Sequence, residues 1–460
     1  MAYQSVNPYN GKIIKTFSEH SDKQLNSAIQ TAESCFREWR HTNYEARAKI
    51  AAKAATLMRA QVNELAGLIT LEMGKLYAQA KGEVMLSADI IDYYAKNAEH
   101  FLAPQKLKPS SGKAIIESAP IGVLFGVEPW NFPYYQLARF AAPNLMAGNV
   151  VMVKHAGSVP QCAIAFENLW LAAGAPIGAY TNLRISFDQV SHVIDDPRIK
   201  GVALTGSGDA GKIVASRAGG SLKKTTMELG GSDAFIVLED ADLEKTVKWA
   251  IWGKMNNMGQ SCVAAKRFIV VEAVADQFLE KFGAALAALK PGDPMDKSTT
   301  LAPLSSEAAL IKLLKQVNQA IVKGATVIMG GKRVDRAGAF MQPTILTNIK
   351  TDNPAFYEEF FGPVALFFRV KNEDEAVALA NDSDYGLGGS VYTKNISRGK
   401  RLASRIDTGM VFINHPTWTA PDLPFGGIKN SGYGRELSML GIQEFVNKKL
   451  VRVASIEAPL

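Results

Sequence analysis

Short runs of β-branched, aromatic and other apolar residues alternate with helical patterns from residue 113 onward, and this alternation is the strongest constraint on the fold. Such runs occupy residues 114–117, 122–127, 150–154, 201–205, 235–238, 268–271, 326–329, 365–370 and 410–413. Strands separated by helices are typical of an α/β fold with largely parallel sheets. Because the runs are nearly all apolar, we expect strands that are covered on both faces.

The first hundred residues differ, because apolar residues recur there every three or four positions. The stretch from Ser21 predicts one amphipathic helix, and Gln24 three residues later is typical of a capping box. A second helix is predicted from about Glu45, with Gly74 where a left-handed C-terminal cap is needed.

Length, charge and cysteine usage exclude several classes of protein. The 460 residues suffice for about three structural units. Basic residues exceed acidic ones, 51 to 44, but form no long run, so no nucleic-acid partner is expected. No membrane span or secretion signal is predicted. Three widely spaced cysteines favour a reducing cytoplasm, and no cluster of Cys or His predicts a metal site.

Cys262 follows a polar turn that contains glycine, at residues 255–261. Main-chain N–H groups of such a turn can stabilise a thiolate, the reactive form of cysteine, by lowering its pKa. The pattern alone leaves two interpretations, a nucleophile or a packed core residue. Cys35 and Cys162 lie in helical and apolar patterns, which favours packing for both.

Three other segments carry residue types suited to catalysis or cofactor binding. Asn131 lies between two prolines after a predicted strand, so its amide can donate to a developing oxyanion. Glu228 stands among apolar and glycine neighbours, a setting that favours a raised pKa and a general base. A further strand runs into the glycine-rich turn 206–211 and then a predicted helix, whose first N–H groups suit a phosphate. Each segment also has a purely structural interpretation, as a strand end or a surface turn.

Six motifs together resemble the aldehyde dehydrogenase superfamily in order and spacing, over nearly the whole chain. They are PWNFP at 129–133, LTGS at 204–207, ELGG at 228–231, GQSC at 259–262, EFFGPV at 359–364 and PFGGIKNSG at 424–432. The resemblance implies an α/β fold with a Rossmann-type cofactor domain, an α/β catalytic domain and a small β oligomerisation element. It also implies NAD(P)-dependent oxidation of an aldehyde to a carboxylic acid.

The resemblance assigns the chemistry to three residues. Cys262 would attack the aldehyde to form a thiohemiacetal, and Asn131 with the Cys262 N–H would stabilise the oxyanion. Once hydride has passed to the nicotinamide, Glu228 would activate the water that hydrolyses the thioester. The residues that match the family's cofactor site are Trp130, Lys154, Gly157, Gly206, Ser207, Leu229, Glu359 and Phe361.

The segment after Lys154 departs from the family pattern. Many members have Lys-Pro-x-Glu where this chain reads Lys154-His155-Ala156-Gly157. That glutamate binds the adenosine ribose hydroxyls and repels a 2′-phosphate, so its absence predicts use of both NAD and NADP and leaves the preference open. His155, in place of proline, is interpreted as a solvent-facing loop residue.

Arg139 bears on the substrate. It falls eight residues after Asn131, where succinate-semialdehyde dehydrogenases carry an arginine that binds the distal carboxylate. The second arginine of those enzymes is replaced by Asn256. Two alternatives therefore stay open, namely succinate semialdehyde or a broader set of aliphatic and ω-carboxylated aldehydes. The side chains expected to line the substrate tunnel are Phe425, Tyr135, Met258 and Trp418.

The expected domains follow from the same resemblance. Residues 1–102 and 123–229 would form the cofactor domain and residues 230–430 the catalytic domain. Residues 103–122 and 431–460 would form the oligomerisation element and tail, because 449–453 alternate like an edge strand. A homodimer or homotetramer is the family expectation.

Three other functions fit the sequence less well than this interpretation. Glu228 argues against a CoA-acylating aldehyde dehydrogenase, a class that usually lacks this base. No motif places a histidine beside Cys262, as a cysteine hydrolase requires. A non-catalytic protein of the same fold would have little reason to keep Cys262, Glu228, Asn131 and Lys154 together.

Overall fold

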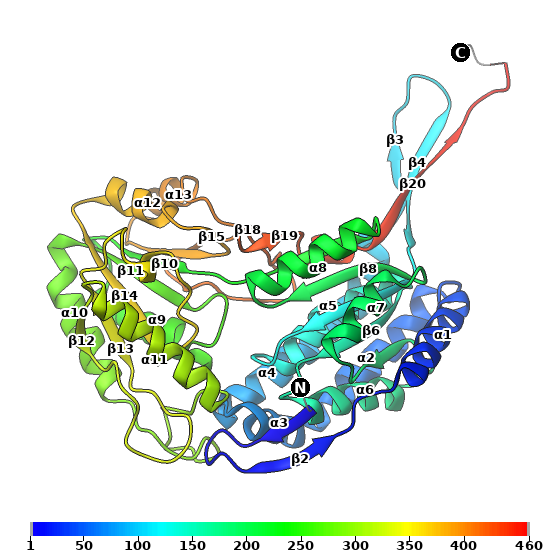
Figure 1. The fold of residues 1–460 in the computed structure, drawn as a ribbon. Coiled ribbons are helices and arrows are strands. Elements are labelled where there is room, and N and C mark those ends of the chain that lie inside the picture. Colours follow the sequence, from blue (N-terminus) through cyan, green and yellow to red (C-terminus); the bar gives the residue numbers. More distant parts are fainter. Residues whose placement is uncertain (1–2, 458–460) are drawn as a thin grey trace.

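Two separate sheets, each made mainly of parallel strands, organise the chain (Figure 1). The computed structural model describes residues 3–457. The first sheet has the order β19-β9-β8-β5-β6-β7, and only β19 runs antiparallel to its neighbour. Its strands are β5 (Val123–Glu128), β6 (Val150–His155), β7 (Tyr180–Asn182), β8 (Ile199–Thr205), β9 (Lys224–Glu228) and β19 (Gly432–Tyr433).

Helices cover both faces of this sheet, because alternate residues of its strands point to opposite sides. Leu124 of β5 packs with one group of helices, whereas Val123 and Phe125 pack with the other. The first group comprises α2 (Tyr44–Ala60), α3 (Val62–Met73), α4 (Tyr77–Phe101), α5 (Pro133–Ala147) and α6 (Pro160–Ala173), and the second comprises α1 (Asp22–Trp39), α7 (Phe187–Asp195) and α8 (Gly208–Gly220).

The second sheet has the order β12-β13-β14-β11-β10-β16-β17, with β12 alone antiparallel. Its strands are β10 (Asp233–Val237), β11 (Ala265–Val271), β12 (Thr326–Met329), β13 (Thr344–Thr347), β14 (Val364–Val370), β16 (Gly389–Tyr392) and β17 (Phe412–Ile413). Each sheet with its helices is called a lobe. The helices of the second lobe are α9 (Leu243–Met255), α10 (Glu272–Ala287), α11 (Glu307–Val322), α12 (Glu373–Asn381) and α13 (Ile396–Ala403).

A three-stranded antiparallel sheet projects from the two lobes as an arm (Figure 1). It consists of β3 (Gln105–Leu107), β4 (Lys113–Pro120) and β20 (Val446–Val453), in the order β20-β4-β3. The predicted edge position of the C-terminal strand is confirmed, since β20 pairs with β4 on one side only. The remaining elements are β1 (Tyr3–Val6), β2 (Ile13–Phe17), β15 (Tyr385–Gly386), β18 (Ile428–Lys429), α14 (Ser438–Ile442) and the 3₁₀ helices η1 (Asn256–Gly259) and η2 (Pro354–Phe356).

The sequence predictions of secondary structure largely hold. Every predicted apolar run overlaps a strand, and Ser21 forms the capping box with Gln24. Gly74 ends α3 in the left-handed conformation, with φ 76°. The single helix predicted from Glu45 is wrong, however, because Gln61 (φ −96°, ψ 17°) leaves the helical region and separates α2 from α3. None of the helices in residues 3–457 is long and apolar enough to span a membrane.

Candidate active site

Cys262 lies in a loop between η1 and β11 whose backbone is held in an unusual conformation. Asn257, Met258 and Gly259 all have positive φ angles, of 51°, 56° and 74°. The side chain of Asn257 secures the turn by donating to the main-chain oxygens of Asn131, at 2.8 Å, and Gln260, at 3.1 Å. Left-handed non-glycine residues cost free energy, so the surrounding contacts must fix this loop.

Burial dominates the environment of the Cys262 thiol and raises its pKa to about 12. The positive charges of Arg139 and Lys266 act in the opposite direction. The turn therefore does not lower the thiol pKa as the sequence predicted, because exclusion of water outweighs the local charges. Cys262 rests as a thiol, and its reaction requires removal of that proton.

The side-chain amide of Asn131 lies against the catalytic loop. It donates to the main-chain oxygen of Gln260 at 3.2 Å, two residues before Cys262. The main-chain oxygen of Asn131 is held by Lys75 at 2.9 Å as well as by Asn257. Within residues 3–457, the Cys262 N–H has no acceptor. The Asn131 amide thus contacts the loop that bears Cys262, and the Cys262 N–H is available as a donor.

Glu228 ends β9 and is buried, with neither carboxylate oxygen hydrogen-bonded within the described residues. Burial raises its pKa well above the ordinary value for glutamate. The two glycines that follow allow tight packing, since a Cβ at Gly230 would lie 2.5 Å from Glu359 Oε2 and one at Gly231 would lie 2.5 Å from the Cys262 oxygen. The glycine pair therefore lets the Glu228 strand approach both Cys262 and Glu359.

Arg139 does not line the active-site cavity, contrary to the expectation of a direct substrate contact. It is 1% exposed, forms an ion pair with Glu436, and donates to Thr205 at 3.0 Å and to Tyr135 Oη at 3.1 Å. Its guanidinium also lies 4.7 Å from the centre of the Phe425 ring. Arg139 therefore forms a second layer behind Tyr135 and Phe425.

Three buried glutamates, Glu128, Glu228 and Glu436, interact electrostatically with this one arginine. Burial raises the pKa of each carboxyl, and the negative charge of Glu436 raises those of Glu128 and Glu228 further. A single guanidinium can neutralise one carboxylate. Glu436 is the carboxylate in direct contact with Arg139, so the guanidinium acts on it at shorter range than on Glu128 and Glu228.

The cavity beside Cys262 has a volume of about 290 Å³. Tyr135, Trp418 and Phe425 line it as expected, together with Phe132 and Trp252. Polar groups reach it from Gln79, Gln136, Asn256, Thr417 and Thr419, and a buried ion pair between Lys75 and Glu83 closes one side.

Met258 was expected to line the tunnel, and that prediction is wrong. Its side chain is buried, with its sulfur accepting from the Ala302 N–H at 3.3 Å. The positive φ of Met258 turns the side chain into the core of the second lobe instead.

Residues matched to a cofactor site gather between the two sheets. Lys266 Nζ lies 3.1 Å from Glu359 Oε1, which also accepts from the Gly231 N–H at 3.1 Å. The Trp130 and Phe361 rings meet edge to face, with centroids 5.9 Å apart. These contacts join the predicted nicotinamide side of the site to the catalytic loop.

The N-terminal end of α8 forms the second part of this site. Ser207 caps the helix, and the Gly206 N–H donates to the main-chain oxygen of Glu228 at 2.9 Å. No described atom lies within 4 Å of a Cβ built at Gly208, so a phosphate can approach the first turn. Leu229 packs on Gly211 beneath that turn.

Lys154 and His155 lie at the C-terminal end of β6. Lys154 Nζ donates to the His155 main-chain oxygen at 3.2 Å, and burial lowers the Lys154 pKa to about 8. The interpretation of His155 as solvent-facing is wrong, because the residue is 1% exposed and its ring contacts the main-chain oxygens of Glu128 and Pro133. Gly157 is partly exposed and lies near β1, since its oxygen accepts from Gln4.

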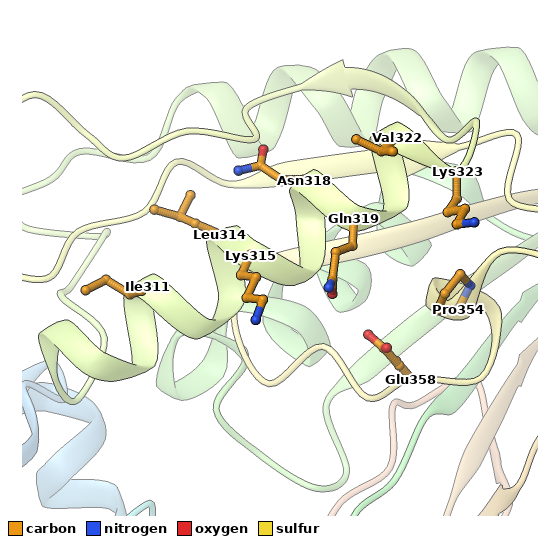
Figure 2. A pocket seen from close by; sticks show the side chains of 9 residues that line it. All are labelled: Ile311, Leu314, Lys315, Asn318, Gln319, Val322, Lys323, Pro354 and Glu358. Atoms are coloured by element: carbon orange, nitrogen blue, oxygen red, sulfur yellow. The ribbon is translucent and has the colours of Figure 1, made fainter.

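A second hollow lies on the surface of the other lobe, along α11 (Figure 2). It is larger, at about 620 Å³, and its lining includes Leu314, Lys315, Val322 and Glu358. None of the residues matched to the active site lines it. We therefore place the chemistry in the smaller cavity, beside Cys262.

Sequence reasoning missed Lys75, Glu83, Lys266, Glu128 and Glu436. A charged residue within an apolar pattern, as at Lys266 between Ala265 and the strand 268–271, was the available signal. Their partners lie far away in the sequence, so spacing could not pair them.

Comparison with known proteins decides the family. The model of the aldehyde dehydrogenase family matches residues 1–451. The chain belongs to the aldehyde dehydrogenase family. This aldehyde dehydrogenase is 52% identical to a succinate-semialdehyde dehydrogenase [NADP(+)] of Deinococcus radiodurans, over 98% of this chain and 94% of the relative. It is 45% identical to a probable enzyme of the same name from a Synechocystis species, over 99% and 100%.

The structural comparison agrees. A crystal structure of succinic semialdehyde dehydrogenase from Streptococcus pyogenes with NADP+ matches this aldehyde dehydrogenase with a TM-score of 0.97 at 45% identity. The match covers 99% of this chain and 100% of that one. The expected fold class and NAD(P)-dependent aldehyde oxidation are thereby confirmed.

Proposed function

We propose that this enzyme oxidises succinate semialdehyde to succinate, with NADP as its main cofactor. The observation that supports succinate semialdehyde as the substrate is a chain of hydrogen bonds through Arg139, Tyr135 and Thr419. Arg139 donates to Tyr135 Oη at 3.1 Å, and Tyr135 Oη lies 2.8 Å from Thr419 Oγ1. Since the phenol oxygen already accepts from a cation, its own hydrogen points toward Thr419 and the cavity, where a substrate carboxylate can accept it.

This arrangement presents the hydroxyl groups of Tyr135 and Thr419 to the cavity without an exposed arginine. Lys75 is paired with Glu83 and contributes no net charge. Arg139 thus acts on the substrate through Tyr135 rather than by contact. An apolar aldehyde would fill the aromatic walls equally well but offer no acceptor to the Thr419 hydroxyl hydrogen.

The first half of the reaction uses Cys262 and Asn131. Glu228, whose negative charge raises the thiol pKa and which lies across the glycine pair, takes the thiol proton as the sulfur attacks the aldehyde carbon. The Asn131 amide and the Cys262 N–H stabilise the oxyanion of the thiohemiacetal. A bound nicotinamide would supply the hydride acceptor for the collapse of this oxyanion.

The second half uses Glu228 again. Glu228 first releases the thiol proton to solvent, and it then takes a proton from the water that attacks the thioester on Cys262. Burial raises the Glu228 pKa, which makes its carboxylate a stronger base than an exposed one. The carboxylic acid leaves, and Cys262 regains its proton.

The residues between the sheets fit a dinucleotide. Lys154 and Glu359 would hold the two riboses, the open first turn of α8 at Gly206 and Ser207 would receive the pyrophosphate, and Trp130 and Phe361 would flank the nicotinamide. Gly157 supplies no carboxylate against a 2′-phosphate, which supports NADP, the cofactor in the names of the relatives. NAD use is expected to be weaker but measurable.

The test is reduced-cofactor absorbance at 340 nm with succinate semialdehyde or butanal, and with NADP or NAD. We expect the highest kcat/KM with the semialdehyde and NADP, without CoA, and none in a Cys262→Ala variant. Equal kcat/KM for both aldehydes would replace this proposal with a broad-specificity enzyme. A Glu228→Gln variant should lose most of its steady-state turnover, because it lacks the proposed base of both half-reactions.

We further propose a homodimer or homotetramer assembled through the arm. Leu107, Leu450 and Val453 are exposed on it, at 42%, 60% and 65%. The outer edges of β3 and β20 are unpaired within the described residues. We propose domain limits near residues 103, 123, 230 and 431, and a reducing cytoplasm in which the three free cysteines stay reduced.

A further inference from the structure

His155 spans the neck of the loop that carries Asn131. The loop, residues 129–132, leaves the end of β5 at Glu128 and enters α5 at Pro133. His155 Nδ1 lies 3.2 Å from the main-chain oxygen of Glu128, and His155 Nε2 lies 3.1 Å from the main-chain oxygen of Pro133. One buried ring therefore contacts the main chain on both sides of the loop.

The strand register explains how the ring reaches both points. Glu128 and His155 are paired residues at the ends of the parallel strands β5 and β6. Their side chains leave the same face of the sheet, the face covered by α5. A proline at this position, the residue expected from the family pattern, offers no ring N–H and could not make these contacts.

The protonation state defines what the ring can do. Burial lowers the His155 pKa to about 4, so the imidazole is neutral near pH 7. A neutral ring carries one N–H, so it donates to one of the two carbonyl oxygens, and its other nitrogen lies near the second without a hydrogen bond. The ring's shape and its single N–H together keep the two ends of the loop at a fixed separation.

We propose that His155 is a positioning residue that fixes the Asn131 loop and thereby aims the Asn131 amide at the oxyanion. The tip of the loop is held separately, because Lys75 and Asn257 both donate to the main-chain oxygen of Asn131. Neck and tip contacts act on the same four residues. Loss of the neck contact would let the amide swing away from the thiol while the fold persists.

The contact between His155 and Lys154, a residue proposed to bind the cofactor, uses a main-chain atom of His155 and not its ring. Lys154 Nζ donates to the main-chain oxygen of His155, which every substitution retains. A changed side chain at this position should therefore affect the oxyanion more than cofactor binding. This separation distinguishes positioning of Asn131 from a general loosening of the site.

The experiment compares His155→Leu, Asn131→Ala and the double variant. This inference rests on the role proposed for Asn131, which Asn131→Ala tests alone by an expected loss of about 10²- to 10³-fold in kcat. We expect His155→Leu to lower kcat about tenfold, the equivalent of one buried hydrogen bond, with the Kd for NADP changed less than about twofold. In the Asn131→Ala background the same leucine should cost less than about twofold.

Two further variants keep the test decisive. His155→Gln retains a side-chain N–H and should recover most of the activity lost in the leucine variant. Tyr180→Phe, a control on the neighbouring strand β7, removes a buried hydroxyl that has no partner among the described residues and should leave kcat unchanged. Equal losses from His155→Leu with and without Asn131, or a weakening of NADP binding as large as the loss in kcat, would overturn the proposal.

Discussion

Lys266 connects Cys262 to Glu359. Its Nζ lies 2.9 Å from the Cys262 main-chain oxygen and 3.1 Å from Glu359 Oε1. The lysine is fully buried, so its charge acts on both neighbours with little screening. The nucleophile and the residue proposed for the nicotinamide ribose therefore share one cation.

Replacing Lys266 with methionine should raise the Cys262 pKa further, because a positive charge that lowers it is lost. Alkylation of Cys262 by iodoacetamide, followed against pH, should then reach half its maximal rate at higher pH than in the wild type. Lys266→Arg keeps the charge and serves as the control. An unchanged alkylation profile in the methionine variant would show that Lys266 has no electrostatic effect on the thiol.

The buried carboxylates predict opposite pH shifts for two variants. Glu228 works as a base only when ionised, so thioester hydrolysis should rise with pH through its raised pKa. Glu436→Gln removes a negative charge that raises this pKa, so the rise should begin at lower pH. Arg139→Met removes the positive charge that lowers it, so the rise should begin at higher pH. Pre-steady-state hydrolysis rates measure both, and shifts in the same direction would contradict the cluster.

The Tyr135 hydroxyl should distinguish charged from uncharged substrates. Tyr135→Phe should lower kcat/KM for succinate semialdehyde by about 10- to 100-fold, as expected for a hydrogen bond to a charged group. The value for butanal should change less than about threefold. Parallel initial-rate measurements check this, and a similar loss on both aldehydes would remove Tyr135 from carboxylate recognition.

The ion pair between Lys75 and Glu83 should matter for stability. Both side chains are almost fully buried, so Lys75→Met leaves an uncompensated carboxylate and should destabilise the fold by about 3–5 kcal/mol. Lys96→Met, which removes an exposed pair with Asp92, should cost less than about 1 kcal/mol. Urea unfolding midpoints compare the two. Similar midpoints would mean that loss of the buried ion pair does not destabilise the fold.

Restoring the family glutamate tests the cofactor argument. Gly157→Glu should lower kcat/KM for NADP by at least about tenfold, or about 1.4 kcal/mol, because a carboxylate would face the 2′-phosphate. The value for NAD should fall less or rise. An unchanged NADP value would place the 2′-phosphate away from Gly157.

Local patterns predicted most of the fold. Apolar runs such as 268–271 gave strands, and Ser21 and Gly74 gave helix ends, because each depends on neighbouring residues. The short strands β7 and β9 were missed, since Tyr180–Asn182 and Lys224–Glu228 mix polar and apolar residues without a clear period. The break at Gln61 carries no proline or glycine to mark it.

The motifs located the site but not its charge balance. Cys262, Asn131 and Glu228 could be singled out from their surroundings in the sequence. That Arg139 would meet Glu436, almost three hundred positions later, depends on tertiary packing alone. The orientation of Arg139, the raised thiol pKa and the burial of His155 all follow from such distant contacts.

The pairing of β19 with β9 has a consequence for biosynthesis. Gly432 pairs with Glu228, and the Leu229 N–H donates to the main-chain oxygen of Ser431 at 3.0 Å. A ribosome that has released residues 1–420 has delivered Cys262, Asn131 and Glu228, yet the strand that bears the base still lacks its neighbour, and Arg139 lacks Glu436. A chain synthesised only as far as residue 420 therefore lacks both the strand partner of β9 and the carboxylate partner of Arg139.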